Sequence, residues 1–209
     1  MNIIVLTPTT DGKLETAYVS SLVNTIFLCQ KEGINVSYMT NDYEPTLPHS
    51  RNVLFKRAIY QKPDAVVWID SDISWHPNDF LKLVISEHDV IGGTYRKKQN
   101  KEEYVASFYK LDPGPVSEVE SLGLGFLKMS NKAINAIWSL SKRYSTDYEG
   151  FRDVFEMEIK NGQIYTEDTL LSNKLRELGI KTYLDKTITC NHIGKTHYVG
   201  DFNEWSKNN

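Results

Sequence analysis

Two aspartates separated by one residue, Asp70 and Asp72, are the sharpest chemical signal in the sequence. They follow residues 65–69, an apolar run that is typical of a buried β-strand. Two carboxylates at this spacing can point the same way, and they then repel one another unless a cation lies between them. Hard divalent ions prefer such oxygen ligands, and a diphosphate completes their shell. The pattern therefore favours a metal and diphosphate site over the alternative, a plain turn or helix cap.

Late in the chain, Glu167 and Asp168 open a predicted helix, and His192 follows the last predicted strand. Acidic residues at a helix N-terminus interact favourably with the helix dipole, by about 0.3–1 kcal/mol each, so a structural role explains the pair. A general base presented to a substrate explains it equally well. A lone histidine is commonly structural, but imidazole also binds Mn²⁺ beside carboxylates. The residue types alone leave both alternatives open at each position.

Several basic side chains are placed to contact an anion. Arg51, at the start of a predicted helix, either contacts phosphate, holds the loop of Asp70 or caps the helix at the surface. The run from Arg96 to Lys101 follows a predicted strand end, and Lys195 follows His192; each either faces water or binds phosphate. No Walker motif and no GxGxxG motif occur in the sequence. A diphosphate would therefore be held by a metal and by side chains rather than by a glycine-rich loop.

Alternating strand and helix patterns surround these residues. Apolar runs predict strands at residues 2–7, 35–40, 65–69, 89–95 and 181–188, and periodicity predicts helices at 14–31, 50–61, 77–86 and 167–178. Less regular strands are predicted at 104–110 and 123–129, with a long loop or mobile segment at 142–163 and a polar tail from residue 201. The alternation predicts an α/β protein with a mostly parallel central sheet flanked by helices. Ligands of such sheets bind beyond the carboxyl ends of the strands.

Composition and charge limit the classes of protein to which the chain can belong. The chain has 209 residues, 40% hydrophobic and 24% charged, which is typical of a globular protein of one domain. Its net charge of −3 argues against a dedicated nucleic-acid binder, which would show a basic excess. Two cysteines, Cys29 and Cys190, make no disulfide framework and no zinc motif. The sequence shows no signal peptide and no membrane-spanning stretch, so we expect a cytoplasmic protein, in the host cytoplasm if a virus encodes it.

Three blocks of sequence together resemble the family-two-like GT-A glycosyltransferases. The first block, residues 50–52 with Ala58 and residues 66–72, resembles the ARN…A…D-x-D core of that family. The second, residues 122–129, is similar to its GxGF strand on the acceptor side. The third resembles the ED…LG…H-x-G end, and it comprises residues 166–168, 175–179, 183–185 and 192–194. The resemblance covers residues 2–198, and stand-alone copies of this size are similar to those that phages and large viruses encode.

The resemblance implies a division of labour within a single GT-A domain, residues 1–209. Residues 1–100 would bind the nucleotide sugar, and residues 101–200 would form the acceptor-binding and catalytic half. The donor would be a nucleotide-diphosphate sugar, with a UDP-sugar favoured, and the acceptor a glycan or glycoprotein. The implied donor-binding residues are Thr7, Pro8, Thr9, Asp42, Arg51, Asp70, Ser71 and Lys195, and the implied acceptor-binding residues are Gly123, Leu124, Gly125 and Glu167.

The same resemblance implies the chemistry. Asp70, Asp72 and His192 would hold Mn²⁺ or Mg²⁺, which would stabilise the leaving diphosphate. Asp168 would be the base of an inverting displacement, and residues 142–163 would close over the donor. Family members often carry an acid after the second strand, and either residue 41 or residue 42 takes that place here.

Two other functions compete with this interpretation. A metal-dependent nucleotidyltransferase or sugar-nucleotide pyrophosphorylase also uses an α/β sheet with acidic metal ligands. It needs a glycine-rich, basic loop after the first strand, which residues 7–12 do not provide. A non-catalytic carbohydrate-binding domain would not need Asp70, Asp72, Asp168 and His192 to converge.

Overall fold

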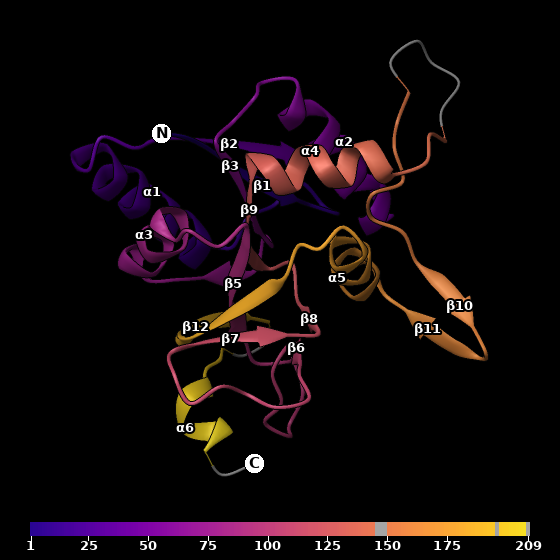
Figure 1. Ribbon diagram of the computed structural model, residues 1–209. Coiled ribbons are helices and arrows are strands. Elements are labelled where there is room, and N and C mark those ends of the chain that lie inside the picture. The colour runs from indigo at the N-terminus through magenta and orange to yellow at the C-terminus, as the bar shows by residue number, and fades with distance from the viewer. Residues whose placement is uncertain (145–149, 195–196, 208–209) are drawn as a thin grey trace.

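The computed structural model describes residues 1–144, 150–194 and 197–207, and Figure 1 labels its elements. The helices are α1 (Thr16–Lys31), α2 (Leu47–Ile59), α3 (Pro77–Ile85), α4 (Asn131–Leu140), α5 (Glu167–Glu177) and α6 (Phe202–Ser206). The large sheet contains β1 (Asn2–Pro8), β2 (Asn35–Asn41), β3 (Ala65–Ile69), β4 (Ile73–Ser74), β5 (Val90–Tyr95), β7 (Val116–Val119), β9 (Phe126–Ser130), β12 (Thr182–Ile193) and β13 (His197–Tyr198). Two small sheets pair β6 (Ala106–Ser107) with β8 (Ser121–Leu122), and β10 (Glu158–Lys160) with β11 (Gln163–Tyr165).

The large sheet is mostly parallel, as the sequence predicts. Its main path runs β13-β12-β5-β9-β3-β1-β2. β1 pairs in parallel with β2 and β3, and β12 pairs in parallel with β5. β9 lies antiparallel between β3 and β5, so these two strands point the same way. Five long strands therefore share one direction, and their carboxyl ends share one edge of the sheet with the start of β9.

Helices cover both faces of this sheet because its central strands are apolar on both sides. In β1, Ile4 and Leu6 pack in a core with side chains of α2 and α4, whereas Ile3 and Val5 pack in a second core with α1 and α3. β3 alternates in the same way. Figure 1 shows α1 and α3 on one side of the sheet and α2 and α4 on the other. None of the described helices is long and apolar enough to cross a membrane.

The predicted long loop at residues 142–163 is wrong in part. Residues 145–149 lie outside the described residues, but beyond them Val154 and Phe155 are fully buried. The Asn52 side chain, from α2, accepts hydrogen bonds from the backbone N–H groups of both residues at 3.0 Å. Farther on, β10 and β11 form an antiparallel hairpin that leads directly into α5. A buried side chain of α2 therefore anchors the segment that precedes the N-terminus of α5.

Three further elements depart from the sequence expectations. The last long strand continues to Ile193 rather than ending near residue 188, because its pairing with β5 resumes after an irregularity between Leu184 and Thr189. Helix α4 was not predicted, although the Ser130 side chain caps it by accepting a hydrogen bond from Ala133 N–H at 3.2 Å. The tail contains α6, which buries Phe202.

Candidate active site

The Asp70–Asp72 turn follows β3 and is tied to its neighbours by backbone hydrogen bonds. Asp70 N–H donates to Gly125 O, just before β9, at 3.3 Å. Ile193 N–H, at the end of β12, donates to Asp72 O at 2.7 Å. The turn is thus fixed from both sides, and its two carboxylates are presented at the edge where the parallel strands end.

The first of these carboxylates is held by a buried arginine. Arg51 Nη2 lies 2.7 Å from Asp70 Oδ1, and Arg51 Nε lies 3.6 Å from Glu167 Oε1. The arginine side chain is only 2% exposed, and its guanidinium lies 5.4 Å from the centre of the Trp68 ring. Burial alone would lower the pKa of Arg51, but Asp70 and Glu167 outweigh it and raise that pKa. Arg51 therefore holds the loop of Asp70, one of the alternatives that the sequence left open.

The same guanidinium keeps hydrogen-bonding capacity. Within the described residues, Arg51 Nε and Nη1 have no hydrogen-bond partner, although both are buried. A buried donor without a partner costs free energy, so these groups are available to an oxygen of a bound ligand. The arginine joins β3 to α5 and presents N–H groups between them.

The second carboxylate meets a different pair of side chains. Lys98 Nζ lies 2.5 Å from Asp72 Oδ2, and His192 Nε2 lies 3.6 Å from the same oxygen. Burial by itself would raise the pKa of the Asp72 carboxyl, but the contacts with His192 and Lys98 outweigh it and lower that pKa. The structure thus brings two of the three predicted metal ligands, Asp72 and His192, to one point. It turns Asp70 towards Arg51, so a metal role for Asp70 stays a prediction.

His192 is held with its Nε2 towards Asp72. Its Nδ1 lies 2.9 Å from Arg96 O, and its ring lies edge-on to Tyr95 with ring centres 5.1 Å apart. A carbonyl oxygen can only accept, so Nδ1 carries the hydrogen and donates it. In the neutral ring, Nε2 then presents its lone pair towards Asp72. A lone pair and a carboxylate oxygen facing one another attract a shared cation.

These residues fit a divalent ion that is bound together with phosphate. Among the described residues, no group of three or more histidine, cysteine or acidic side chains converges. Mg²⁺ in proteins is commonly held by one or two carboxylates together with substrate phosphates and water, and Mn²⁺ also accepts imidazole. Asp72 and His192 are therefore sufficient protein ligands when a diphosphate supplies further oxygens.

The end of β1 borders this cluster. Thr9 Oγ1 donates to Asp42 Oδ1 at 2.7 Å, and Thr7 Oγ1 lies 2.5 Å from the Tyr18 hydroxyl. Asn41 instead donates through its side chain to Ser50 Oγ at 3.1 Å. Of the two positions that the sequence left open after the second strand, residue 42 is thus the acid that faces the end of β1. Pro8 ends β1, and Lys195 lies outside the described residues.

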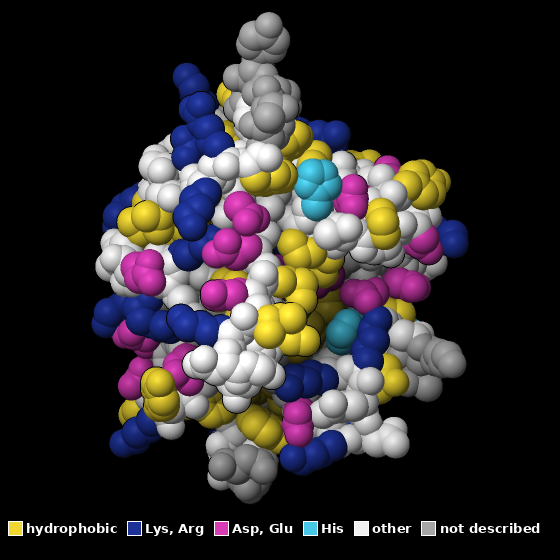
Figure 2. Space-filling view, turned by 90° about the vertical axis from the view of Figure 1, so that its right-hand side faces the viewer, with side chains coloured by type: hydrophobic (Ala, Val, Ile, Leu, Met, Phe, Trp, Pro, Cys, Tyr) yellow, Lys and Arg dark blue, Asp and Glu magenta, His cyan; other side chains and the backbone are white. Residues whose placement is uncertain are grey.

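A cavity of about 240 Å³ opens between the loop that follows β1 and the side chains around Asp72. Asp11 and Lys13 line one side, and Ser71, Asp72 and Lys98 line the other. Figure 2, which shows one face of the molecule, shows a hollow near its centre where acidic, basic and histidine side chains gather. A pocket with both charge signs suits a ligand that carries a phosphate and a cation together.

Asp168 lines a separate cavity of about 320 Å³, together with Lys97, Ser107, Gly123 and Thr169. Its Oδ1 accepts hydrogen bonds from the Thr166 hydroxyl and, at 2.7 Å, from Thr169 N–H. Within the described part of the chain, the hydrogen bonds to its side chain all end on Oδ1, so Oδ2 keeps its lone pairs. The helix-cap role and the general-base role are therefore compatible in this side chain.

The two glycines before β9 are required by a tyrosine that the sequence analysis did not assign to the site. Gly125 N–H donates to the Tyr95 hydroxyl at 3.0 Å. A Cβ atom at Gly123 would lie 2.7 Å from that hydroxyl oxygen, and one at Gly125 would lie 2.5 Å from it. Burial, followed by the nearby Asp70 charge, raises the pKa of Tyr95 well above its usual value. Leu124 between them is buried in the core, so its acceptor-binding role stays a prediction.

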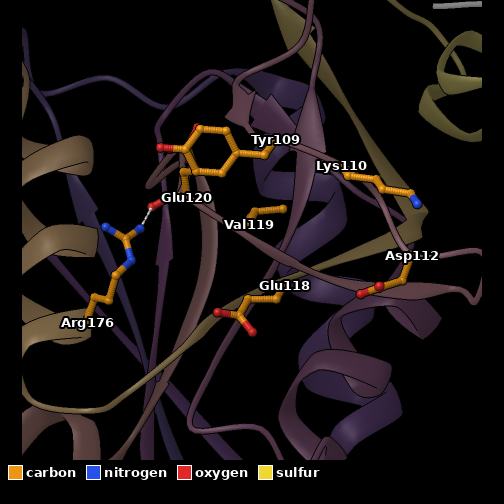
Figure 3. Close-up of a pocket in the computed structure, with 7 residues that line it drawn as sticks. All are labelled: Tyr109, Lys110, Asp112, Glu118, Val119, Glu120 and Arg176. Carbon is orange, nitrogen blue, oxygen red and sulfur yellow. Dashed lines mark hydrogen bonds between the residues drawn. The ribbon is translucent and has the colours of Figure 1, made fainter.

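Another hollow, of about 420 Å³, lies on the second half of the chain and contains none of the predicted site residues. Figure 3 shows Arg176 of α5 donating to the backbone oxygen of Glu120, and Tyr109 beside them. Charges of both signs line it, from Lys110, Asp112, Glu118 and Arg176. It lies away from the carboxylates of the Asp70–Asp72 turn, and we assign it no chemistry.

This chain is similar to known proteins in structure rather than in sequence. No known protein family matches the sequence, and no curated protein matches it either. A197 from the virus STIV matches with a TM-score of 0.63 at 18% identity, over 93% of this chain and 87% of that chain. GalNAc-T7, crystallised with UDP, GalNAc and Mn²⁺, matches with a TM-score of 0.52 at 12% identity, over 94% of this chain and 44% of that chain. This chain has the GT-A-type fold.

The fold that the resemblance implied is thereby confirmed. A third GT-A-type match, S. aureus TarS 1-349, has a TM-score of 0.50 at 17% identity and covers 95% of this chain and 60% of that chain. At these identities the likeness establishes the GT-A-type fold alone.

Proposed function

We propose that this chain is a glycosyltransferase that moves a sugar from a nucleotide-diphosphate sugar to a hydroxyl group of an acceptor. The arrangement of two sites at one sheet edge carries the proposal: Asp72 with His192 in one, and Asp168 in the other. Buried Arg51 joins Asp70 and Glu167, the neighbours of these two sites. A domain that only binds carbohydrate needs neither a base nor an ion-paired connection between two sites.

The donor half binds the nucleotide diphosphate. We assign the base and ribose to the end of β1, where Thr7, Pro8 and Thr9 lie beside Asp42. Asp70, Ser71, Arg51 and Lys195 complete the donor-binding set, with a UDP-sugar as the favoured donor. The GT-A-type fold supports this assignment, because GalNAc-T7 was crystallised with UDP.

Asp72 and His192 would hold the metal ion, Mn²⁺ or Mg²⁺. Their convergence around one oxygen, and the lone pair that His192 Nε2 presents, support this role. When bound, the ion would act as a Lewis acid that stabilises the charge developing on the leaving diphosphate. In the mechanism, Asp72 and His192 fix the position of that charge, and Arg51 fixes Asp70 beside it.

Asp168 would take the proton from the acceptor hydroxyl in an inverting displacement. Its Oδ2 keeps its lone pairs while Thr166 and Thr169 hold Oδ1. General-base catalysis of this kind contributes about 10²–10⁴-fold to a rate. The acceptor, a glycan or glycoprotein, would approach through the cavity that Gly123 lines, with Gly125 beside it, and Glu167 would support the site through Arg51.

Ligand-induced stabilisation tests the donor assignment. A ligand that binds only the native state at about 100 times its Kd adds about 2.7 kcal/mol to the free energy of unfolding. UDP or GDP with Mn²⁺ should raise the melting temperature more than the nucleotide or the metal alone. Equal stabilisation with and without Mn²⁺ would contradict the metal site. Release of pyrophosphate from a nucleoside triphosphate and a sugar phosphate would instead identify a nucleotidyltransferase.

A transfer assay tests the base. With a donor found in that screen, Asp168→Asn should retain nucleotide and Mn²⁺ binding but lower single-turnover transfer by about 10²–10⁴-fold, because an amide cannot accept the proton. Glu177→Gln makes the same change of charge near the end of the same helix, at an exposed position, and should leave transfer unchanged. Near-normal transfer by Asp168→Asn would refute the base assignment and favour a retaining mechanism.

A further inference from the structure

A lysine occupies the side of Asp72 on which a metal would bind. Lys98 Nζ lies 2.5 Å from Asp72 Oδ2, which is the same oxygen that faces His192 Nε2 at 3.6 Å. An ammonium and a divalent ion cannot share this oxygen at full strength, because like charges repel at such distances. The resident ammonium must therefore leave Asp72 when an ion bridges Asp72 and His192.

The lysines in the turn after β5 have different ion-pair partners. Lys97 and Lys101 both pair with Glu103, at 3.4 Å and 2.9 Å. Arg96 Nη2 donates to Asn100 O at 2.9 Å, which closes the turn. Lys98 alone among these lysines has its described ion pair with a residue of the candidate site.

The ion pair between Lys98 and Asp72 can exchange its cation. Its side chain is 36% exposed, and a lysine carries a compact charge on a long flexible stem. An ion pair that water reaches is weak, so a stronger cation can displace the ammonium. The displaced ammonium stays within the cavity that Ser71, Asp72 and Lys13 line, where a diphosphate is the expected ligand.

We propose that Lys98 is an exchangeable counter-ion: it neutralises Asp72 before the metal binds, and it binds the donor's diphosphate once the metal has displaced it. The inference rests on the proposed function and deepens it, because it assigns to one residue both competition with the metal and recognition of the leaving group. Lys98 therefore makes binding of metal and nucleotide mutually dependent. A metal ion that binds alone must displace Lys98 from Asp72 and leaves the lysine without a partner. When diphosphate binds with the metal, the displaced lysine gains a new partner.

Direct measurement of Mn²⁺ binding by electron paramagnetic resonance separates the two steps. Lys98→Met removes the charge and keeps a flexible chain, and Lys101→Met is the matched control in the same turn. Lys98→Met should bind Mn²⁺ alone about tenfold more tightly than the wild type. In saturating Mn²⁺, calorimetry should find that the same variant binds UDP about tenfold more weakly. Lys101→Met should change neither affinity.

Each outcome decides the proposal. Unchanged or weaker Mn²⁺ binding by Lys98→Met would show that Lys98 does not compete with the metal ion for Asp72. Tighter Mn²⁺ binding with unchanged UDP affinity would show that Lys98, once displaced, does not bind the diphosphate. If wild-type protein binds neither UDP nor any other nucleoside diphosphate, the proposed function fails, but the titration with Mn²⁺ alone still tests the competition at Asp72. Melting curves of both variants verify that the fold is intact.

Discussion

The two aspartates of one turn are similarly exposed, at 26% and 31%, but their partners differ in burial. Asp70 pairs with Arg51, whose side chain is 2% exposed and which also faces Glu167. Asp72 pairs with Lys98, whose side chain is 36% exposed. Breaking a buried pair leaves an uncompensated charge, whereas an exposed pair exchanges partners at little cost. The two carboxylates of a D-x-D turn can therefore differ in role: one pairs with a buried side chain of the scaffold, and the other keeps an exposed partner that can be exchanged.

The largest effect should follow removal of the buried arginine. Arg51→Met should lower the free energy of unfolding by about 3–5 kcal/mol, because it leaves Asp70 and Glu167 without their shared counter-ion. Denaturant unfolding measures the change. Arg57→Met, an exposed change on the same helix, should stay within about 0.5 kcal/mol of the wild type. A loss below about 1 kcal/mol for Arg51→Met would remove the distinction between the two carboxylates.

The residue next to Arg51 tests how far the buried connection extends. Asn52→Ala removes the side chain that binds the backbone of Val154 and Phe155, and it leaves two buried N–H groups unpaired. We expect a loss of about 1–3 kcal/mol and faster amide exchange at both residues, with Asn135→Ala, at an exposed position of α4, as the control. Unchanged exchange at Val154 and Phe155 would show that α2 does not anchor this segment.

The exposed cluster should respond in binding rather than in stability. His192→Gln should weaken Mn²⁺ binding by about tenfold or more, because even residues that only support a metal ligand affect affinity by this amount. Calorimetric titration measures it, and His49→Gln provides a control histidine outside the cluster. If the variant instead loses stability and keeps its Mn²⁺ affinity, His192 is a structural residue.

The smallest expected effect is on the pH dependence of the free energy of unfolding. The pKa of Asp72 is lowered below its usual 3.8 in the folded protein, so the charged carboxylate stabilises the fold above that pH and loses this contribution as pH falls. Asp72→Asn should therefore cost less than about 1 kcal/mol near neutral pH, where the pair with Lys98 is partly exposed. The difference between variant and wild type should shrink on acidification. Urea unfolding along a pH series checks this, and a constant difference at all pH values would contradict it.

Local patterns were sufficient to predict much of the sheet. Apolar runs such as residues 65–69 are buried on both faces, which gives parallel strands a recognisable sequence, and the sheet order then brings their ends together. The turn of Asp70 and Asp72 could be placed at the edge where the parallel strands end for this reason. Gly33 and Gly179, which adopt positive φ angles, likewise marked the ends of α1 and α5.

Partners that are distant in sequence could not be predicted. Nothing local to Lys98 distinguishes it from Lys97 or Lys101, because the choice depends on where Glu103 and Asp72 lie in the fold. β12 was predicted too short, although its alternation of buried and exposed residues continues to residue 191, because its last residues pair with β4, a strand that is distant in sequence. These polar residues, including His192, therefore do not look like strand residues.

The position of β9 has a consequence for how the chain reaches its native state. This strand comes from the second half of the sequence, yet it lies between β3 and β5, which both come from the first half. A chain truncated at residue 100 would lack the strand that separates these two, so residues 1–100 should not fold independently. Contacts between strands so far apart in sequence require closing a long loop, which slows folding. During synthesis, residues 1–100 should therefore acquire a protease-resistant core only after residue 130 has left the ribosome.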